Sequence, residues 1–331
     1  MDLDVVFLGT SGSAPTANRS PAALLVRRGG DRLLFDCGEG TQRQLMRSAV
    51  GLPELEEIFL THFHADHYLG LPGMLKTFAL RQRETPLRIY GPPGLRELFG
   101  SLKRIFGRVT YAIDVVEVRA GEALERPGYR VLVYPVHHGV SAVGYAVVEE
   151  PRPGFFDVEA ADALGVPPGP ERGALQRGDS VTLDDGRVVT PDEVLGSARA
   201  GRRIVIPGDT AIAETVRVLA EGADLLVHEA TFADEERERA AETLHSTALQ
   251  AAEMARDAGV RMLALTHVSP RYFGPELARE ARAIFPATVV PRDFDVVEIP
   301  FPERGEPRLA KGGAAPGTAP AGADASVRVP R

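Results

Sequence analysis

The residues 61–67 read THFHADH and follow the apolar run Ile58, Phe59, Leu60. They contain three of the 8 histidines of the chain, together with an aspartate. Imidazole and carboxylate groups so close together at the end of a strand can share metal ions, and this mixture suits Zn²⁺, Mn²⁺ or Fe²⁺. An ordinary polar surface loop would rarely gather four such side chains. The stretch therefore predicts a metal site at the C-terminal end of a buried strand.

The cysteine count and the net charge limit which kind of metal site and which class of protein the sequence can encode. The 331 residues include one cysteine, Cys37, which excludes an internal disulfide and a Cys-rich structural zinc site, so an open and reactive site is expected. The net charge of −8 argues against a non-specific nucleic-acid binder. No secretory signal and no apolar stretch long enough for a membrane span stand out, so we expect a cytoplasmic protein.

Four more ligand-type residues come directly after other apolar runs: His137, His138, Asp209 and His267. Either His137 or His138 could complete the shell of a first metal. A Gly-Asp-Thr sequence such as the one around Asp209 is more often a turn or a helix N-cap, but beside a second set of histidines its carboxylate is a candidate bridge between two metals. His228 lies within an apolar strand and is expected to be a core histidine or to support a ligand.

Short apolar segments alternate with helical ones before residue 150 and again after residue 202, which predicts a layered α/β architecture with ligand sites at strand ends. Residues 151–201 are rich in Pro, Gly, Asp and Arg and predict a protruding arm or a long surface loop. Residues 302–331 have few large apolar side chains, so we expect a disordered tail. The expected domain is therefore 1–301, with the arm inserted.

The residues resemble a known family. THFHADH is similar to the His-x-His-x-Asp-His signature of the metallo-β-lactamase fold, which implies a fold and metals but no substrate. Longer stretches resemble the ribonuclease Z family, endonucleases that remove the 3′ trailer from precursor tRNA. These stretches are GTSGSAPTANRSPAALLV (9–26), FDCGEGTQRQLMRS (35–48), THFHADHYLGLPGML (61–75), GDT (208–210), ADLLVHEATF (223–232), HSTALQAAEMARDAGV (245–260) and LTHVSPRY (265–272).

The resemblance implies a four-layer αββα metallo-β-lactamase sandwich with a protruding exosite arm. It implies two divalent metal ions per chain, with Zn²⁺ as the first choice and Mn²⁺ or Fe²⁺ as alternatives. It also implies a precursor tRNA substrate and a homodimer in which the arm of one subunit helps to bind the tRNA of the other.

HHGVSAVGY resembles the third metal motif of the family and selects His138 over His137. The expected ligand set has three parts. The first metal would bind His62, His64 and His138, the second would bind Asp66, His67 and His267, and Asp209 would bridge them.

The expected reaction is hydrolysis after the discriminator nucleotide, which leaves a 3′-hydroxyl on the tRNA and a 5′-phosphate on the trailer. Asp66 would orient or deprotonate the attacking water, and His245, held by Glu229, would protonate the leaving oxygen. The resemblance implies the same pair. Arg271 could bind a phosphate or could simply be exposed. Asp36 could orient a ligand or cap a turn.

Residues 164–189 resemble the exosite arm of the family, and its candidate RNA contacts here are Gly169, Pro170, Arg172 and Arg177. The family arm tends to be basic, whereas this segment also carries Glu171, Asp179, Asp184 and Asp185. It could therefore contact RNA through main-chain amides and shape, or bind it more weakly and with less dependence on salt. Val268 stands where Phe is common.

Two alternatives stay open. One is a phosphodiesterase or esterase of the same fold that acts on a small substrate. The other is a non-catalytic RNA-binding relative, against which the complete set of candidate ligands argues.

Overall fold

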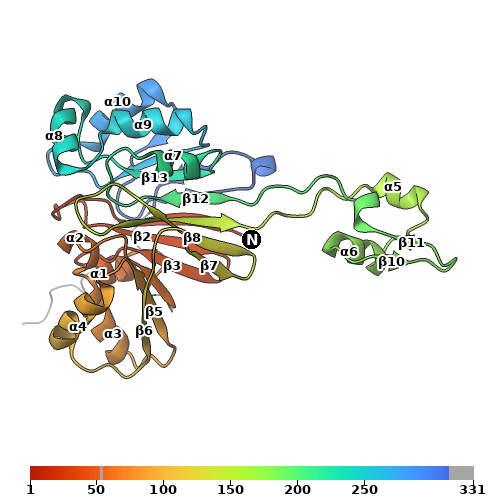
Figure 1. Ribbon diagram of the computed structural model, residues 1–331, viewed down its shortest axis with the longest axis horizontal. Coiled ribbons are helices and arrows are strands. Elements are labelled where there is room, and N and C mark those ends of the chain that lie inside the picture. Colours follow the sequence, from red (N-terminus) through yellow and green to blue (C-terminus); the bar gives the residue numbers. More distant parts are fainter. Residues whose placement is uncertain (53–54, 313–331) are drawn as a thin grey trace, which may run out of the picture.

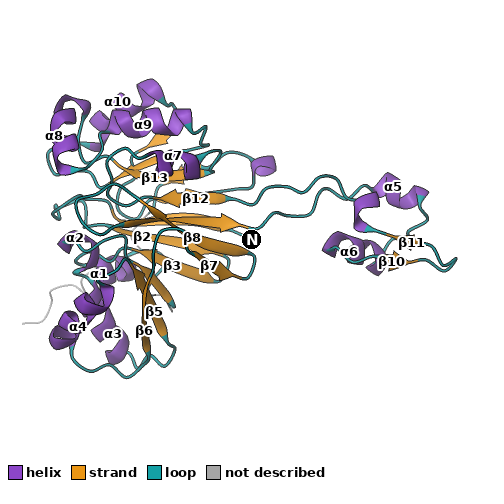
Figure 2. Ribbon diagram, viewed as in Figure 1, coloured by secondary structure: helices purple, strands orange, loops and turns teal. Residues whose placement is uncertain are grey.

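The computed structural model describes residues 1–52 and 55–312. Within them two β-sheets lie face to face, with helices on both outer sides, so the predicted four-layer αββα sandwich is confirmed (Figures 1 and 2). The first sheet has the order β17-β16-β1-β2-β3-β4-β5-β6 and the second has the order β15-β14-β13-β12-β9-β8-β7.

The strands of the first sheet are β1 (Leu3–Gly9), β2 (Ala23–Arg28), β3 (Asp31–Phe35), β4 (Glu57–Phe59), β5 (Leu87–Gly91), β6 (Ile113–Glu117), β16 (Val296–Glu298) and β17 (Arg308–Ala310). Those of the second are β7 (Ala123–Arg126), β8 (Tyr129–Pro135), β9 (Val143–Glu149), β12 (Arg203–Ile206), β13 (Leu225–Glu229), β14 (Leu263–Thr266) and β15 (Thr288–Val289).

Helices cover the two outer faces (Figure 2). Beside the first sheet lie α1 (Thr41–Arg47), α2 (Ala65–Tyr68), α3 (Leu71–Leu80) and α4 (Leu95–Phe106). Beside the second lie α7 (Glu214–Ala220), α8 (Arg237–Thr243), α9 (Ala248–Asp257) and α10 (Gly274–Ile284). The central strands are therefore buried on both faces, which explains why they read as continuous apolar runs rather than as alternating ones.

An aromatic cluster fills the space between the sheets below the THFHADH loop. The rings of Phe35 and Phe59 stack with centroids 4.9 Å apart, and Tyr145 of the opposite sheet packs edge-on against Phe59 at 5.4 Å. The hydroxyl of Tyr145 donates to the carbonyl of Leu60 across 2.9 Å. This bond joins the second sheet to the residue directly before the loop, so the loop is held by both layers.

Residues 151–201 project from the sandwich as an arm on two extended segments (Figure 1). The arm contains α5 (Val158–Ala163), α6 (Pro170–Arg177), β10 (Val181–Thr182), β11 (Val188–Val189) and the 3₁₀ turn Pro191–Glu193. Its own small apolar cluster comprises Ala161, Val166, Leu175, Val189 and Val194. The sequence predicted a protruding arm or a long surface loop here, and the segment does project. The arm also has a small core of its own, because a few well-spaced aliphatic side chains suffice to hold so small a unit.

The predicted disordered tail, 302–331, needs a correction over its first part. Residues 302–304 form a 3₁₀ turn, and β17 pairs antiparallel with β16, with Leu309 opposite Val297. The apolar side chain of Leu309 packs against the core between the sheets, which accounts for the order of this segment. Residues 313–331 lie outside the described part of the chain.

Candidate metal centre and active site

The predicted ligand residues lie on loops at one edge of the sandwich, where strands of both sheets end. His62 and His64 follow β4, Asp66 and His67 belong to the short helix α2, His138 follows β8, Asp209 follows β12 and His267 follows β14. The structure brings all seven together in two adjoining groups.

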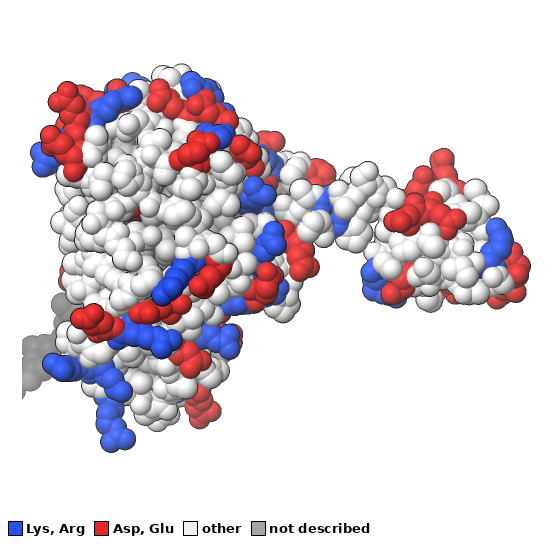
Figure 3. All heavy atoms as spheres, viewed as in Figure 1, with Lys and Arg blue, Asp and Glu red and all other residues white. Residues whose placement is uncertain are grey.

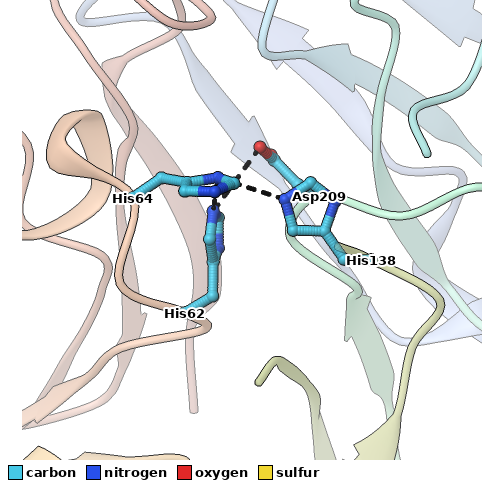
Figure 4. A group of neighbouring side chains, drawn as sticks. All are labelled: His62, His64, His138 and Asp209. Atoms are coloured by element: carbon cyan, nitrogen blue, oxygen red, sulfur yellow. Dashed lines mark hydrogen bonds and ion pairs between the residues drawn. The ribbon is translucent and has the colours of Figure 1, made fainter. Parts of the chain in front are cut away.

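The first group contains His62, His64, His138 and Asp209, whose side chains point toward one another (Figure 4). His62 Nε2 lies 3.0 Å from His64 Nδ1, and His138 Nε2 lies 3.2 Å from the same atom. Asp209 Oδ2 is 3.7 Å from His62 Nε2. The neighbouring His137 is exposed and does not join the group; its backbone pairs with Ala211.

The second group contains Asp66, His67 and His267. His267 Nε2 lies 3.2 Å from Asp66 Oδ2 and 3.4 Å from His67 Nε2. Asp209 Oδ2 is 3.4 Å from His67 Nε2 and 3.3 Å from His267 Nε2. One carboxylate oxygen of Asp209 is therefore close to ring nitrogens of both groups.

Asp36 determines which ring nitrogen faces the centre in two of the histidines. Its Oδ2 lies 2.8 Å from His67 Nδ1, so Nδ1 donates to it and, in the neutral ring, the lone pair is on Nε2. Its carboxylate also accepts the hydroxyl proton of Thr61, at 3.0 to 3.1 Å. Thr61 Oγ1, 3.0 Å from His62 Nδ1, can then only accept from that ring. His62 therefore also presents Nε2 to its group.

Thr231 and Leu244 do the same for two more histidines. The hydroxyl of Thr231 donates to Glu229 Oε2 across 2.6 Å and so accepts from His267 Nδ1 at 2.8 Å. His138 Nδ1 donates to the carbonyl of Leu244 at 3.1 Å. Sequence reasoning missed both residues; a polar side chain at the end of strand β13 was the only local signal for Thr231.

The backbone is unusual at several of these positions. Asp36, Leu244 and His267 have positive φ angles of 57°, 56° and 55°, although none is glycine. Such conformations cost of the order of 1–3 kcal/mol each and often occur at functional sites. Here they direct the Asp36 carboxylate, the Leu244 carbonyl and the His267 ring toward the centre.

The donor set fits divalent metal ions. Neutral imidazole nitrogens and carboxylate oxygens converge, with no thiolate among the contributing residues. Burial and the neighbouring His67 ring lower the pKa of His62 to about 2, so this ring stays neutral and its Nε2 can only accept. Acceptor nitrogens that face each other at 3.0 to 3.2 Å repel unless a cation or a proton lies between them.

His245 and Glu229 form a hydrogen-bonded pair beside both groups. Glu229 Oε1 lies 2.8 Å from His245 Nδ1, and the carboxylate also accepts from the amides of Thr210 and Ser246 at 2.8 and 3.2 Å. Burial lowers the pKa of His245, but the hydrogen bond and charge of Glu229 outweigh this effect and raise it to about 9. For Glu229 the two effects have the opposite signs: burial raises the pKa of its carboxyl group, but the hydrogen bond with His245 leaves this pKa below its usual value. The pair therefore combines a carboxylate with an imidazole that favours its protonated form.

His228, which precedes Glu229, is fully buried, and its Nδ1 lies 2.8 Å from the carbonyl of Glu229. It belongs to none of the ligand groups found in the described residues.

The candidate substrate-binding residues are spread over two places. Arg271 lies at the rim, where its Nη1 is 2.8 and 3.0 Å from the carboxylate oxygens of Glu236. Its guanidinium is 6.0 Å from the ring of Phe232, which packs edge-on against His245. The candidates on the arm stand apart from this centre, at the start and along α6: Gly169, Pro170, Arg172 and Arg177.

The two arginines of α6 differ in their freedom. Arg172 Nε lies 3.1 Å from the carbonyl of Val166, and its Nη2 contacts Asp162. The side chain of Arg177 is 69% exposed. Its Nε lies 3.9 Å from Asp179 Oδ2, which is too far for a hydrogen bond. Arg177 is thus the better placed of the two to meet a ligand.

Comparison with known proteins places this centre in context. Residues 18–155 match the model of the metallo-beta-lactamase superfamily. Ribonuclease Z of Methanosarcina acetivorans is 45% identical over 302 residues, which are 90% of this chain and 99% of that protein. Ribonuclease Z of Myxococcus xanthus is 46% identical over 303 residues, 90% of this chain and 98% of that protein.

A solved structure agrees with these relatives. The crystal structure of human tRNase Z, short form, superposes with a TM-score of 0.66 at 28% identity, over 90% of this chain and 99% of that one. Among the helices of the described residues, none combines the length and apolar character that crossing a bilayer requires.

Proposed function

This chain belongs to the ribonuclease Z family of tRNA 3′-processing endoribonucleases, and we propose that its histidine-rich centre cuts precursor tRNA after the discriminator nucleotide. The observation that carries the proposal is the pair of ligand groups that meet at Asp209 directly beside the His245–Glu229 pair. The products are a tRNA with a 3′-hydroxyl and a trailer with a 5′-phosphate.

The centre is proposed to hold two divalent cations, with Zn²⁺ as the first choice and Mn²⁺ or Fe²⁺ as alternatives. His62, His64 and His138 would hold one, Asp66, His67 and His267 the other, and Asp209 would contact both. Bound there, the ions supply Lewis-acid activation of a water molecule and stabilise negative charge at phosphorus.

The residues of the chain handle the protons. His245 Nδ1 donates to Glu229, so the proton on Nε2 is the one available to the leaving O3′ atom, which becomes the 3′-hydroxyl as its bond to phosphorus breaks. Glu229 keeps the imidazole in this orientation throughout. Asp66, whose Oδ2 accepts from the amide of Ser13 at 2.8 Å, is proposed to orient or deprotonate the attacking water.

Substrate contacts are proposed at the rim and on the arm. Arg271 uses only Nη1 toward Glu236, which leaves the other edge of its guanidinium suited to a phosphate. On the arm we propose Gly169, Pro170, Arg172 and Arg177. On the face of the arm that Figure 3 shows, acidic and basic side chains are interspersed. This distribution favours recognition through main-chain groups and shape over a purely electrostatic grip.

The proposal extends to the assembly and the compartment. The enzyme is proposed to act in the cytoplasm as a homodimer, in which the arm of one subunit reaches the tRNA bound by the other. Sedimentation of the free protein and of its complex with tRNA measures both stoichiometries.

Incubation with a precursor tRNA labelled at its 5′ end tests the function. A single cut after the discriminator nucleotide, abolished by a chelator, supports the proposal. Efficient hydrolysis of bis(p-nitrophenyl) phosphate with poor cleavage of the precursor would instead favour a small-substrate phosphodiesterase. Fewer than two ions per chain and no turnover of either substrate would favour a non-catalytic RNA-binding protein.

A further inference from the structure

The stem of the arm is a thin two-stranded ribbon. Arg152 and Arg199 face each other in it, and their backbones exchange hydrogen bonds of 2.7 and 2.9 Å. Farther out, Gly196 donates to the carbonyl of Phe155 at 2.9 Å. An isolated ribbon of two strands is only marginally stable in water, so these bonds alone do not fix the direction of the arm.

Glu303, in the 3₁₀ turn Pro302–Arg304 of the body, binds both strands of the stem. Its carboxylate lies 2.7 and 3.2 Å from Nη1 and Nη2 of Arg152 and 3.0 Å from Nη1 of Arg199. The hydrogen bond from Arg152 is the main reason that the pKa of Glu303 falls to about 2. One carboxylate thus links the outgoing and the returning strand to a single point on the body.

Phe301, two residues earlier, contacts the guanidinium group of Arg152 as well and that of a further arginine, Arg202. Its ring centroid is 3.5 Å from the guanidinium carbon of Arg152 and 4.0 Å from that of Arg202. Contacts of this kind are stronger where the cation is shielded from water, and Arg202 is only 2% exposed.

Arg202 anchors the base of the stem. It donates to Glu149 from Nε at 2.7 Å and from Nη2 at 2.9 Å, and to the carbonyl of Ile299 at 2.8 Å. Arg28 donates to the same carboxylate at 2.8 Å. Glu149 ends β9 and Arg202 precedes β12, so both ends of the stem are tied at one buried point.

We propose that Phe301 and Glu303 form a bracket that sets the direction of the arm relative to the catalytic centre, and that they are positioning residues for substrate binding. The bracket is defined by these two residues. It acts through Arg152 and Arg199, and neither bracket residue touches the reacting atoms. The kinetic consequence rests on the proposed function, because only a substrate that contacts arm and centre together depends on their relative placement.

The physical argument is one of effective concentration. Once the substrate is bound at one of two sites, a stiff connection between the sites keeps the effective concentration of the second site high. A connection that swings freely lowers this effective concentration. Removal of the bracket is therefore expected to raise KM for precursor tRNA by about five- to tenfold with little change in kcat.

The direction of the arm is measured first, without any substrate. Cys37 is buried, so spin labels attach selectively to cysteines introduced at Asp184 on the arm and Ser101 on α4. In this labelled protein, Glu303→Ala and Phe301→Leu are expected to broaden the distance distribution. Glu306→Ala is the matched control, since Glu306 lies in the same segment, is 77% exposed and pairs with Arg261 rather than with the arm. An unchanged distribution in both bracket variants would overturn the proposal.

Kinetics then compares precursor tRNA with bis(p-nitrophenyl) phosphate. For the bracket variants we expect the higher KM with the precursor alone, unchanged hydrolysis of the small ester, and wild-type behaviour of Glu306→Ala. An equal loss with both substrates would mean that the segment supports the centre, not the arm, and would contradict the inference. If the wild-type protein fails to cut the precursor, the proposed function fails, while the distance measurement still decides whether the bracket holds the arm.

Discussion

The carboxylate of Asp36 lies 2.8 Å from Nδ1 of His67 and also accepts the hydroxyl of Thr61, which in turn faces His62. One buried acid therefore orients a histidine in each of the two ligand groups. The backbone of Asp36 has a positive φ of 57°, and its carboxylate contacts both His67 and Thr61.

Replacement of Asp36 by Asn is expected to weaken metal binding by about 10- to 100-fold, because a neutral amide with one acceptor oxygen replaces the carboxylate that accepts from His67 and from Thr61, the partner of His62. Titration of the apoprotein against a competing chelator measures this affinity. Asp114→Asn, at a site that is 59% exposed, serves as the control. Unaltered affinity in Asp36→Asn would reduce Asp36 to a turn residue.

His245→Ala is expected to lower kcat by about 10²- to 10⁴-fold, because the leaving oxygen loses its proton donor. Metal content and tRNA affinity should stay at wild-type values. His137→Ala is the matched control, an exposed histidine beside the ligand His138. Loss of metal from His245→Ala would show that this residue acts as a ligand, a role that its proximity to Asp209 and His267 makes testable.

Asp209→Asn is expected to remove at least one ion per chain and to abolish turnover, since its carboxylate oxygen lies near ring nitrogens of both groups. Elemental analysis after gel filtration counts the ions. Dialysis of the wild-type protein against a chelator should likewise stop cleavage, and added Zn²⁺ or Mn²⁺ should restore it. Full metal content in Asp209→Asn would rule out the bridging position.

Arg271→Ala is expected to weaken binding of precursor tRNA and to reduce the slope of log K against log salt by about 1, the value for one lost phosphate contact. Binding is measured at several salt concentrations in the slowly cleaving His245→Ala background, so that the precursor stays intact during the measurement. Arg256→Ala, on an exposed face of α9, is the control. An unchanged slope would leave Arg271 as a partner of Glu236 only.

Glu149 governs a pH-dependent part of the stability. Burial raises its pKa, but hydrogen bonds and charges from Arg202 and Arg28 outweigh this effect and lower the pKa below its usual value. The unfolded chain therefore binds the proton first as the pH falls, so the stabilisation is fully present above the unfolded pKa and is lost as the pH falls through the folded one.

At pH 7, Glu149→Gln is expected to lower the free energy of unfolding by about 3 kcal/mol, because two nearly buried arginines lose their counter-charge. Urea unfolding at a series of pH values should show the wild type approaching the variant below about pH 4. Glu214→Gln, which removes an exposed ion pair on α7, should change stability far less. A constant difference across the whole pH range would contradict the linkage.

The sequence predicted the fold class and the cluster of candidate ligands because both depend on local patterns. Polar residues follow buried apolar strands, and parallel strands end at a common edge, so the pattern alone could place His62, one of His137 and His138, Asp209 and His267 near one another. The ribonuclease Z resemblance then selected His138 over its neighbour.

Other features depend on contacts between distant segments, which no local pattern reveals. Thr231 matters because its single proton goes to Glu229 and so determines the tautomer of His267. Leu244 contributes only a carbonyl, which any residue could supply. Strand β17 is ordered by pairing with β16 and by the burial of Leu309, not by its own composition. The stem contacts of Glu303 join residues more than 100 positions apart.

The origin of the ligands from both sheets has a consequence for biosynthesis. His62, His64, Asp66 and His67 follow a strand of the first sheet, whereas His138, Asp209 and His267 follow strands of the second. His267 is made late, so a nascent chain still lacking it carries an incomplete centre. The complete centre can therefore form only after residues 62 to 267 have been synthesised and the two sheets have packed against each other.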